Sequence, residues 1–131
     1  MILVDTSVLI DYLSDAENSA VDKFQSILDD KLSFGISPFV YQEVLQGAKS
    51  GADFQRLKDY LNTLRFYYLS DLKHSCEQAA RIFFECRMDG YTISSTMDCL
   101  IAQTAIEHKL YLLSRDRDFE RVAKVVNLKL Y

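Results

Sequence analysis

Met1-Ile2-Leu3-Val4-Asp5-Thr6-Ser7 opens the chain, and this stretch decides the fold because a short apolar run ends in an acid. A continuous apolar run of this length is typical of a strand buried on both faces, as in a parallel sheet. Thr6 or Ser7 is expected to cap a helix that continues to Leu13. The opening therefore predicts a buried strand, an acid at its carboxyl end and a helix directly after it.

The same alternation of strands and helices continues along the chain. Further strands are expected at 32–36, 65–69, 111–114 and 125–130. Further helices are expected at 19–28, 38–47 and 52–64, from 70 or 71 to 88, from 94 or 95 onward and from 118 onward. This order predicts an α/β fold with a mainly parallel central sheet and helices on both faces. We expect residues 1–131 to form a single domain, because a chain of this length buries one core.

The composition narrows the class of protein. The 131 residues are 49% hydrophobic and 26% charged, as in ordinary globular domains. No apolar run approaches the ~20 residues that span a bilayer, so no membrane partner is expected. The beginning of the chain shows no signal peptide, and Cys76, Cys86 and Cys99 form no CxxC pair, which predicts reduced thiols and a cytoplasmic location. The net charge of −4 does not decide between partners.

Four carboxylates lie where hydrophobic segments meet loops or open helices: Asp5, Glu43, Asp98 and Asp116. Taken singly, an acid at such a place has a structural explanation as a helix cap or a turn residue. In parallel sheets, however, ligands bind beyond the carboxyl ends of the strands, and folding can bring all four acids to that edge. Four acids at matching positions therefore predict a site.

Clustered acids repel one another and resist burial unless a cation neutralises them. Carboxylate oxygens suit Mg²⁺ or Mn²⁺, and the isolated His74 and His108 provide no competing site for a softer metal. The chain contains neither GxxxxGK[ST] nor GxGxxG, which disfavours nucleotide and dinucleotide binding. An acidic site without a phosphate-gripping loop favours hydrolysis of a polymer backbone.

Four segments in this order resemble PIN-domain ribonucleases, specifically the VapC-like toxins of type II toxin–antitoxin systems. The segments are ILVDTSVLI at 2–10, SPFVYQEVLQG at 37–47, DCLIA at 98–102 and LLSRDRDF at 112–119. Together they cover nearly the whole chain. The resemblance implies a PIN-like α/β nuclease domain over residues 1–131.

The resemblance also implies roles for individual residues. The catalytic acids would be Asp5, Glu43, Asp98 and Asp116. Asp5, Asp98 and Asp116 would hold Mg²⁺ or Mn²⁺, with Thr6 and Ser114 as supporting hydroxyl residues. Asp118 is a second candidate for the fourth acid, and its alternative role is to cap the following helix. Arg115 and Arg117 flank Asp116 and are expected to contact RNA phosphates.

On this basis the chain is expected to be a metal-dependent endoribonuclease that hydrolyses RNA phosphodiester bonds and inhibits translation as the toxin of a toxin–antitoxin pair. A cognate antitoxin and a second copy of the chain are the implied partners. An alternative is a catalytically weak PIN-fold protein that acts mainly as an antitoxin-bound co-repressor. A haloacid-dehalogenase-type phosphatase is disfavoured, because that family has a second acid two residues after the first, where this chain has Ser7.

Overall fold

The computed structural model describes residues 1–131 and contains one five-stranded sheet. The strands are β1 (Ile2–Val4), β2 (Phe34–Ile36), β3 (Arg65–Phe66), β4 (Tyr111–Leu113) and β5 (Lys129–Leu130). Their order across the sheet is β3-β2-β1-β4-β5, and every neighbouring pair is parallel. The five predicted strands are confirmed, although β3 and β5 at the sheet edges are shorter than expected.

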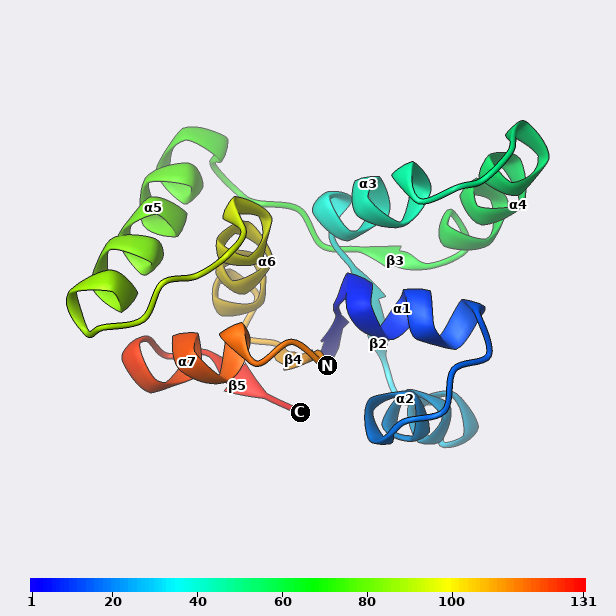
Figure 1. The fold of residues 1–131 in the computed structure, drawn as a ribbon, viewed down its shortest axis with the longest axis horizontal. Helices are drawn as coiled ribbons and strands as arrows, with labels where there is room; N and C mark the ends of the chain where they lie inside the picture. Colours follow the sequence, from blue (N-terminus) through cyan, green and yellow to red (C-terminus); the bar gives the residue numbers. More distant parts are fainter.

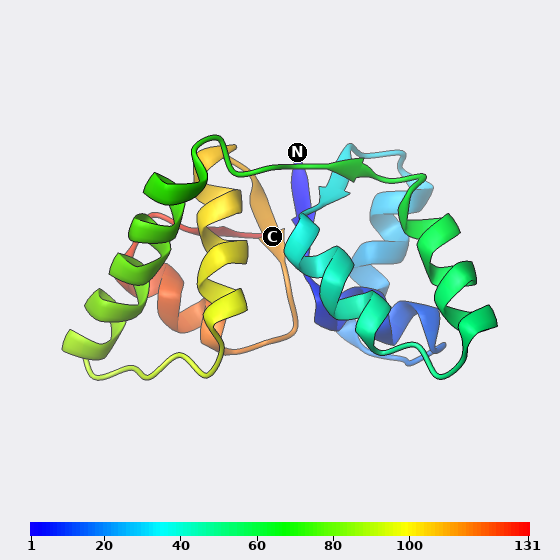
Figure 2. The ribbon, with the colours of Figure 1, turned by 90° about the horizontal axis from the view of Figure 1, so that it is seen from above.

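Seven helices cover the sheet. They are α1 (Thr6–Leu13), α2 (Ser19–Asp29), α3 (Pro38–Gln46), α4 (Gly51–Leu61), α5 (Leu72–Met88), α6 (Thr96–Glu107) and α7 (Asp118–Val125). Figures 1 and 2 show α1–α4 gathered on one side of the central strands and α5–α7 on the other. The predicted α/β fold, with helices on both faces of a parallel sheet, is confirmed.

The central strand explains why the opening of the chain decides the fold. All three residues of β1 are buried, since β1 pairs with β2 on one side and β4 on the other and helices cover both faces. The two largest fully buried side chains, Phe24 of α2 and Phe119 of α7, come from opposite sides of the sheet. Because both faces are covered, an unbroken apolar sequence fits this strand better than an alternating one.

The parallel register brings three parts of the chain to one sheet edge. Val4 pairs with Leu113, so Asp5 and Ser114 leave their strands side by side, and the Asp5 N–H donates to the Leu113 carbonyl at 2.9 Å. Figure 2 shows the beginning of α6 and the turn after β4 at the same edge where β1 leads into α1. This is the carboxyl edge where a ligand site was predicted.

The helix caps agree with the sequence except at α1 and α7. Asp118, whose alternative role was to cap the last helix, is the first residue within α7, and Arg117 is the cap without a side-chain hydrogen bond. Ser37 caps α3 ahead of Pro38, as predicted, and Gly90 follows α5 with a φ of 90° that favours glycine. The prediction that Thr6 or Ser7 caps α1 is wrong. Both residues already lie within the helix, and Asp5, with an extended backbone, is the cap. Asp5 therefore combines a structural role with its place at the site.

Gly35 in β2 is required by a close approach between strands. A Cβ atom at this position would lie 2.5 Å from the Arg65 carbonyl oxygen and 2.7 Å from the Tyr67 ring. We expect Gly35→Ala to destabilise the protein by about 2 kcal/mol, because backbone of β3 must move to admit the methyl group. Thermal unfolding measures this loss, and Gly51→Ala is the control because its Cβ would meet no atom within 4 Å. Equal unfolding temperatures for the two variants would contradict this packing argument.

Candidate metal and catalytic site

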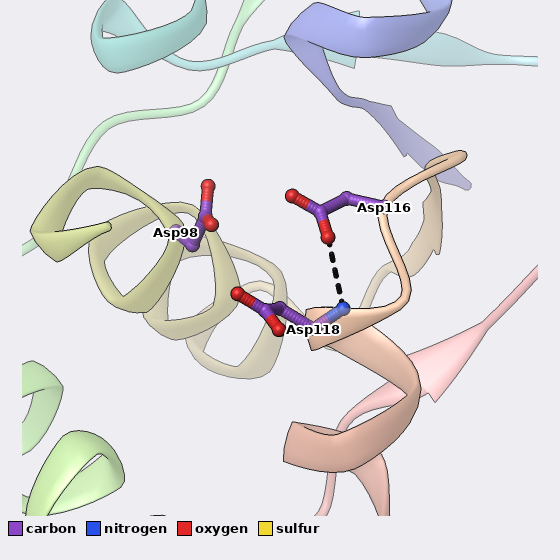
Figure 3. Close-up of side chains that lie close together, drawn as sticks. All are labelled: Asp98, Asp116 and Asp118. Atoms are coloured by element: carbon purple, nitrogen blue, oxygen red, sulfur yellow. Dashed lines mark hydrogen bonds between the residues drawn. The ribbon is translucent and has the colours of Figure 1, made fainter. Parts of the chain in front are cut away.

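Three aspartates form the centre of the site. Asp98 lies in the first turn of α6, Asp116 lies in the turn after β4, and Asp118 is the first residue of α7. One carboxylate oxygen from each lies within 4.8 Å of the other two. Figure 3 shows the three side chains directed toward one another from these separate elements. The third and fourth sequence motifs therefore meet in space.

The other two acids, Asp5 and Glu43, lie outside this set of three, and hydroxyl groups hold each of them. Asp5 is 4% exposed, and its Oδ2 accepts hydrogen bonds from Ser7 Oγ and Ser114 Oγ, each at 2.7 Å. Thr6 Oγ1 donates to Glu43 Oε1 at 2.8 Å and so links α3 to the beginning of α1. These bonds fix one oxygen of Asp5 and one of Glu43. The second oxygen of each carboxylate accepts no hydrogen bond within the chain.

The convergence of the acids changes the pKa of Asp98 most strongly. Burial, and after it the neighbouring charges of Asp116, Asp5, Glu43 and Asp118 in that order, together raise the pKa of Asp98 to about 7. No donor in the protein forms a hydrogen bond to its carboxylate, although Asp98 is 8% exposed. A buried carboxylate that accepts no hydrogen bond and faces four other acids suits a divalent cation. The cation would supply the positive charge that no protein side chain provides to Asp98.

Asp116 and Asp118 differ in how their oxygens are used. Asp118 Oδ2 accepts from the Ser94 N–H at 3.0 Å and from Ser94 Oγ at 2.8 Å, and Oδ1 accepts from Arg121 Nη1 at 2.7 Å. The hydrogen bond from the Ser94 N–H is the main reason why the pKa of Asp118 is lowered. Asp116 Oδ1 accepts only the Asp118 N–H, at 2.9 Å, which leaves Oδ2 free. Asp116 thus retains an oxygen for a ligand, whereas both oxygens of Asp118 are engaged.

The expected supporting residues Thr6 and Ser114 lie at the site. Of the two expected phosphate contacts, Arg115 forms an ion pair and Arg117 does not. Ser114 bridges Asp5 and the Asp116 N–H, which donates to Ser114 Oγ at 3.0 Å. Arg115 points to α1, where its Nε lies 2.7 Å from Asp11 Oδ2. Arg117 is exposed and forms no ion pair.

Sequence reasoning did not identify three residues that contact the acids. They are Ser7, Ser94 and Arg121. The spacing of Asp118 and Arg121, three apart on one helix, is a signal that the sequence does contain. Ser94 gives no such signal, because it contacts an acid that lies 24 residues further along the chain.

No helix in the structure combines the length and the apolar character needed to cross a membrane.

Comparisons with known proteins agree on one family. The PIN domain family model matches residues 2–125. VapC ribonuclease Mb1587 of Mycobacterium bovis is 30% identical over 130 residues, which is 98% of this chain and 96% of that relative. Ribonuclease VapC11 of Mycobacterium tuberculosis matches with the same identity and the same coverage.

Solved structures show the same architecture. The structure of VapBC2 from Rickettsia felis bound to a DNA fragment from their promoter has a TM-score of 0.76 at 22% identity, covering 100% of this chain and 98% of the other. A toxin–antitoxin complex from Klebsiella pneumoniae has a TM-score of 0.68 at 26% identity, covering 89% and 88% of the two chains. With the converging acids and the full-length matches, the chain belongs to the PIN-domain family and is related within it to the VapC ribonucleases.

Proposed function

We propose that this protein is a metal-dependent endoribonuclease and the toxin of a toxin–antitoxin pair, formed by one nuclease domain over residues 1–131. The observation that carries the proposal is the convergence of Asp98, Asp116, Asp5 and Glu43 at the carboxyl edge of the sheet. The full-length relatives named as VapC ribonucleases supply the substrate class, which is RNA.

The donor set favours Mg²⁺ or Mn²⁺, because every side chain at the centre offers a carboxylate oxygen and none offers sulfur or imidazole nitrogen. We propose that Asp98, Asp116 and Asp5 hold the cation through oxygens that accept no hydrogen bond within the chain. A bound cation would activate water toward phosphorus and offset negative charge on the phosphodiester. Glu43, held by Thr6, would orient water or accept its proton.

The hydroxyl groups fix the directions of the acids. Ser7 and Ser114 hold Asp5 by the same oxygen, so its other oxygen faces a defined direction before any ligand binds. Thr6 does the same for Glu43. Residues that orient metal-binding carboxylates in this way commonly change metal affinity or activity by about 10- to 100-fold when mutated.

The proposed partners are RNA, a cognate antitoxin and a second copy of the chain. The 26% identical Klebsiella pneumoniae protein is part of a toxin–antitoxin complex, which supports an antitoxin for this chain. Arg115 and Arg117, which flank Asp116, remain the proposed phosphate contacts. To contact a phosphate, Arg115 would have to leave or share its ion pair with Asp11. We also propose a cytoplasmic location, which the three free cysteines support.

We expect purified protein, separated from any antitoxin, to cleave RNA with Mg²⁺ or Mn²⁺ and to lose cleavage with EDTA. Asp5→Asn should lower the rate by about 100-fold or more, because the amide removes negative charge from the proposed cation site. Gel analysis of a labelled RNA measures both effects. Asp59→Asn, on the exposed side of α4, is the control and should cleave normally. Cleavage that persists unchanged in EDTA would refute metal dependence.

A further inference from the structure

Arg121 is the only cationic residue that forms an ion pair with an acid of the site. Its Nη1 lies 2.7 Å from Asp118 Oδ1, and Asp118 contributes an oxygen to the set within 4.8 Å that includes Asp98 and Asp116. The guanidinium therefore lies at the rim of the acidic centre, one carboxylate away from the proposed cation position.

The contact differs from an ordinary pair on a helix surface. Asp53 and Arg56 of α4 have the same spacing and the same distance of 2.7 Å, but the Asp53 side chain is 26% exposed and that of Arg56 is 63% exposed. The Asp118 side chain is 7% exposed and is fixed from the other side by the two Ser94 bonds. Arg121 thus pairs with an aspartate that is buried and held in place by Ser94, whereas Arg56 pairs with an aspartate that is more open to solvent.

The anchored guanidinium keeps capacity for another acceptor. An arginine has five N–H donors, and Arg121 uses one of them, on Asp118. Its side chain is 46% exposed, so the remaining donors reach solvent beside the site. Guanidinium groups bind phosphate oxygens in pairs, and holding the group in place beforehand lowers the entropy lost on binding.

An RNA strand at this site meets a repulsive field. Five carboxylates surround the reacting position, and the chain carries a net charge of −4. A protein cation beside the site would offset this repulsion for a phosphate next to the cleaved one. Arg115 is paired with Asp11 on α1 and Arg117 is held by no acid, whereas Arg121 is held in place by an acid of the centre itself.

We propose that Arg121 binds a backbone phosphate of the RNA next to the one that is cleaved, and that Asp118 positions it for this contact. This inference rests on the proposed ribonuclease function. It gives α7 a role in holding substrate, and it explains why an acid at the site has both oxygens occupied by donors from the protein.

The test measures binding of a labelled single-stranded RNA by fluorescence anisotropy in the Asp98→Asn background, over a series of salt concentrations. Arg121→Gln should weaken binding about tenfold and reduce the slope of log K against log salt by about 0.7, the share of one phosphate contact on a single strand. Arg121→Lys should keep the slope, because it keeps the charge. In the active protein, Arg121→Gln should raise KM about tenfold and change kcat less than about threefold.

Arg56→Gln is the matched control, since it removes an arginine from the same type of pair away from the acids. An unchanged slope and KM in Arg121→Gln, or an equal loss in Arg56→Gln, would overturn the inference. So would a loss confined to kcat and Mn²⁺ affinity, which indicates a purely structural pair. If the wild-type protein neither binds nor cleaves RNA, the proposed function fails as well. If it cleaves and Arg121→Gln keeps both the wild-type KM and the wild-type salt slope, only this inference fails.

Discussion

Replacing Asp98 by asparagine is expected to lower RNA cleavage by about 10³-fold or more, equal to about 4 kcal/mol of transition-state stabilisation. Asp98 is the acid that faces all the others and accepts no hydrogen bond from the protein. We therefore expect its negative charge to serve the binding of a cation. Cleavage rates at saturating Mn²⁺, together with calorimetric titration of Mn²⁺, measure the loss.

The same variant should be more stable than the wild-type protein when metal is absent. Asparagine removes a buried charge that burial and the charges of Asp116, Asp5, Glu43 and Asp118 disfavour. A gain of about 1 kcal/mol moves the unfolding temperature of a domain of this size by roughly 4 °C. A structural acid behaves in the opposite way, because its loss removes stabilising contacts. Simultaneous loss of activity and gain of stability therefore identifies a functional acid.

The dependence of stability on pH provides a second readout of Asp98. Its pKa is about 7 in the folded protein, against an ordinary value of 3.8. Between these values the folded state binds a proton that the unfolded state lacks, so this contribution to stability rises as pH falls from about 7 to 4. Unfolding temperatures in EDTA should show this rise in the wild-type protein, and Asp98→Asn should flatten it. Parallel curves for the two proteins would contradict the raised pKa.

Much of the fold follows from short-range patterns that the sequence contains. The apolar run at Ile2–Val4 predicts a central parallel strand, and Ser37 with Pro38 predicts the beginning of α3. Both predictions are confirmed, because the apolar run and the helix cap each depend only on residues that are neighbours in the sequence. The edge strands were predicted too long, since their length depends on how many partners a neighbouring strand offers. β3 pairs with β2 through two residues only.

In the candidate site, too, the features that depend on nearby residues were predictable and those that depend on distant residues were not. The positions of Asp5 and Asp116 after strands were enough to predict that they meet, because parallel strands end at one edge. The use of each oxygen was not predictable, since it depends on donors that are distant in sequence. Ser94 reaches Asp118 across 24 residues, and Ser114 reaches Asp5 across 109. The choice between Asp116 and Asp118 therefore stays a prediction, in which the hydrogen bonds of the two residues favour Asp116.

The second large effect is expected when Asp116→Asn is compared with Asp118→Asn. Asp116→Asn should lower cleavage by about 100-fold or more and weaken Mn²⁺ binding with little change in unfolding temperature, because it removes a free oxygen and a charge. Asp118→Asn should lower the unfolding temperature, since it weakens charge-assisted bonds to Ser94 and Arg121 worth about 1.5–3 kcal/mol each. Mn²⁺ titration and thermal unfolding of both variants separate the two roles.

Ser94→Ala provides the control for this comparison, because it removes the Oγ donor to Asp118 and leaves every acid in place. It should reproduce part of the stability loss of Asp118→Asn, and the double variant should lose less than the sum of the two, since both changes break the same contact. The reverse order, with Mn²⁺ binding abolished by Asp118→Asn and retained in Asp116→Asn, would make Asp118 the metal ligand. The cation would then share an Asp118 oxygen with Ser94 or Arg121. The occupation of both oxygens of the buried Asp118 by protein donors argues against that arrangement, because those donors compete with the cation.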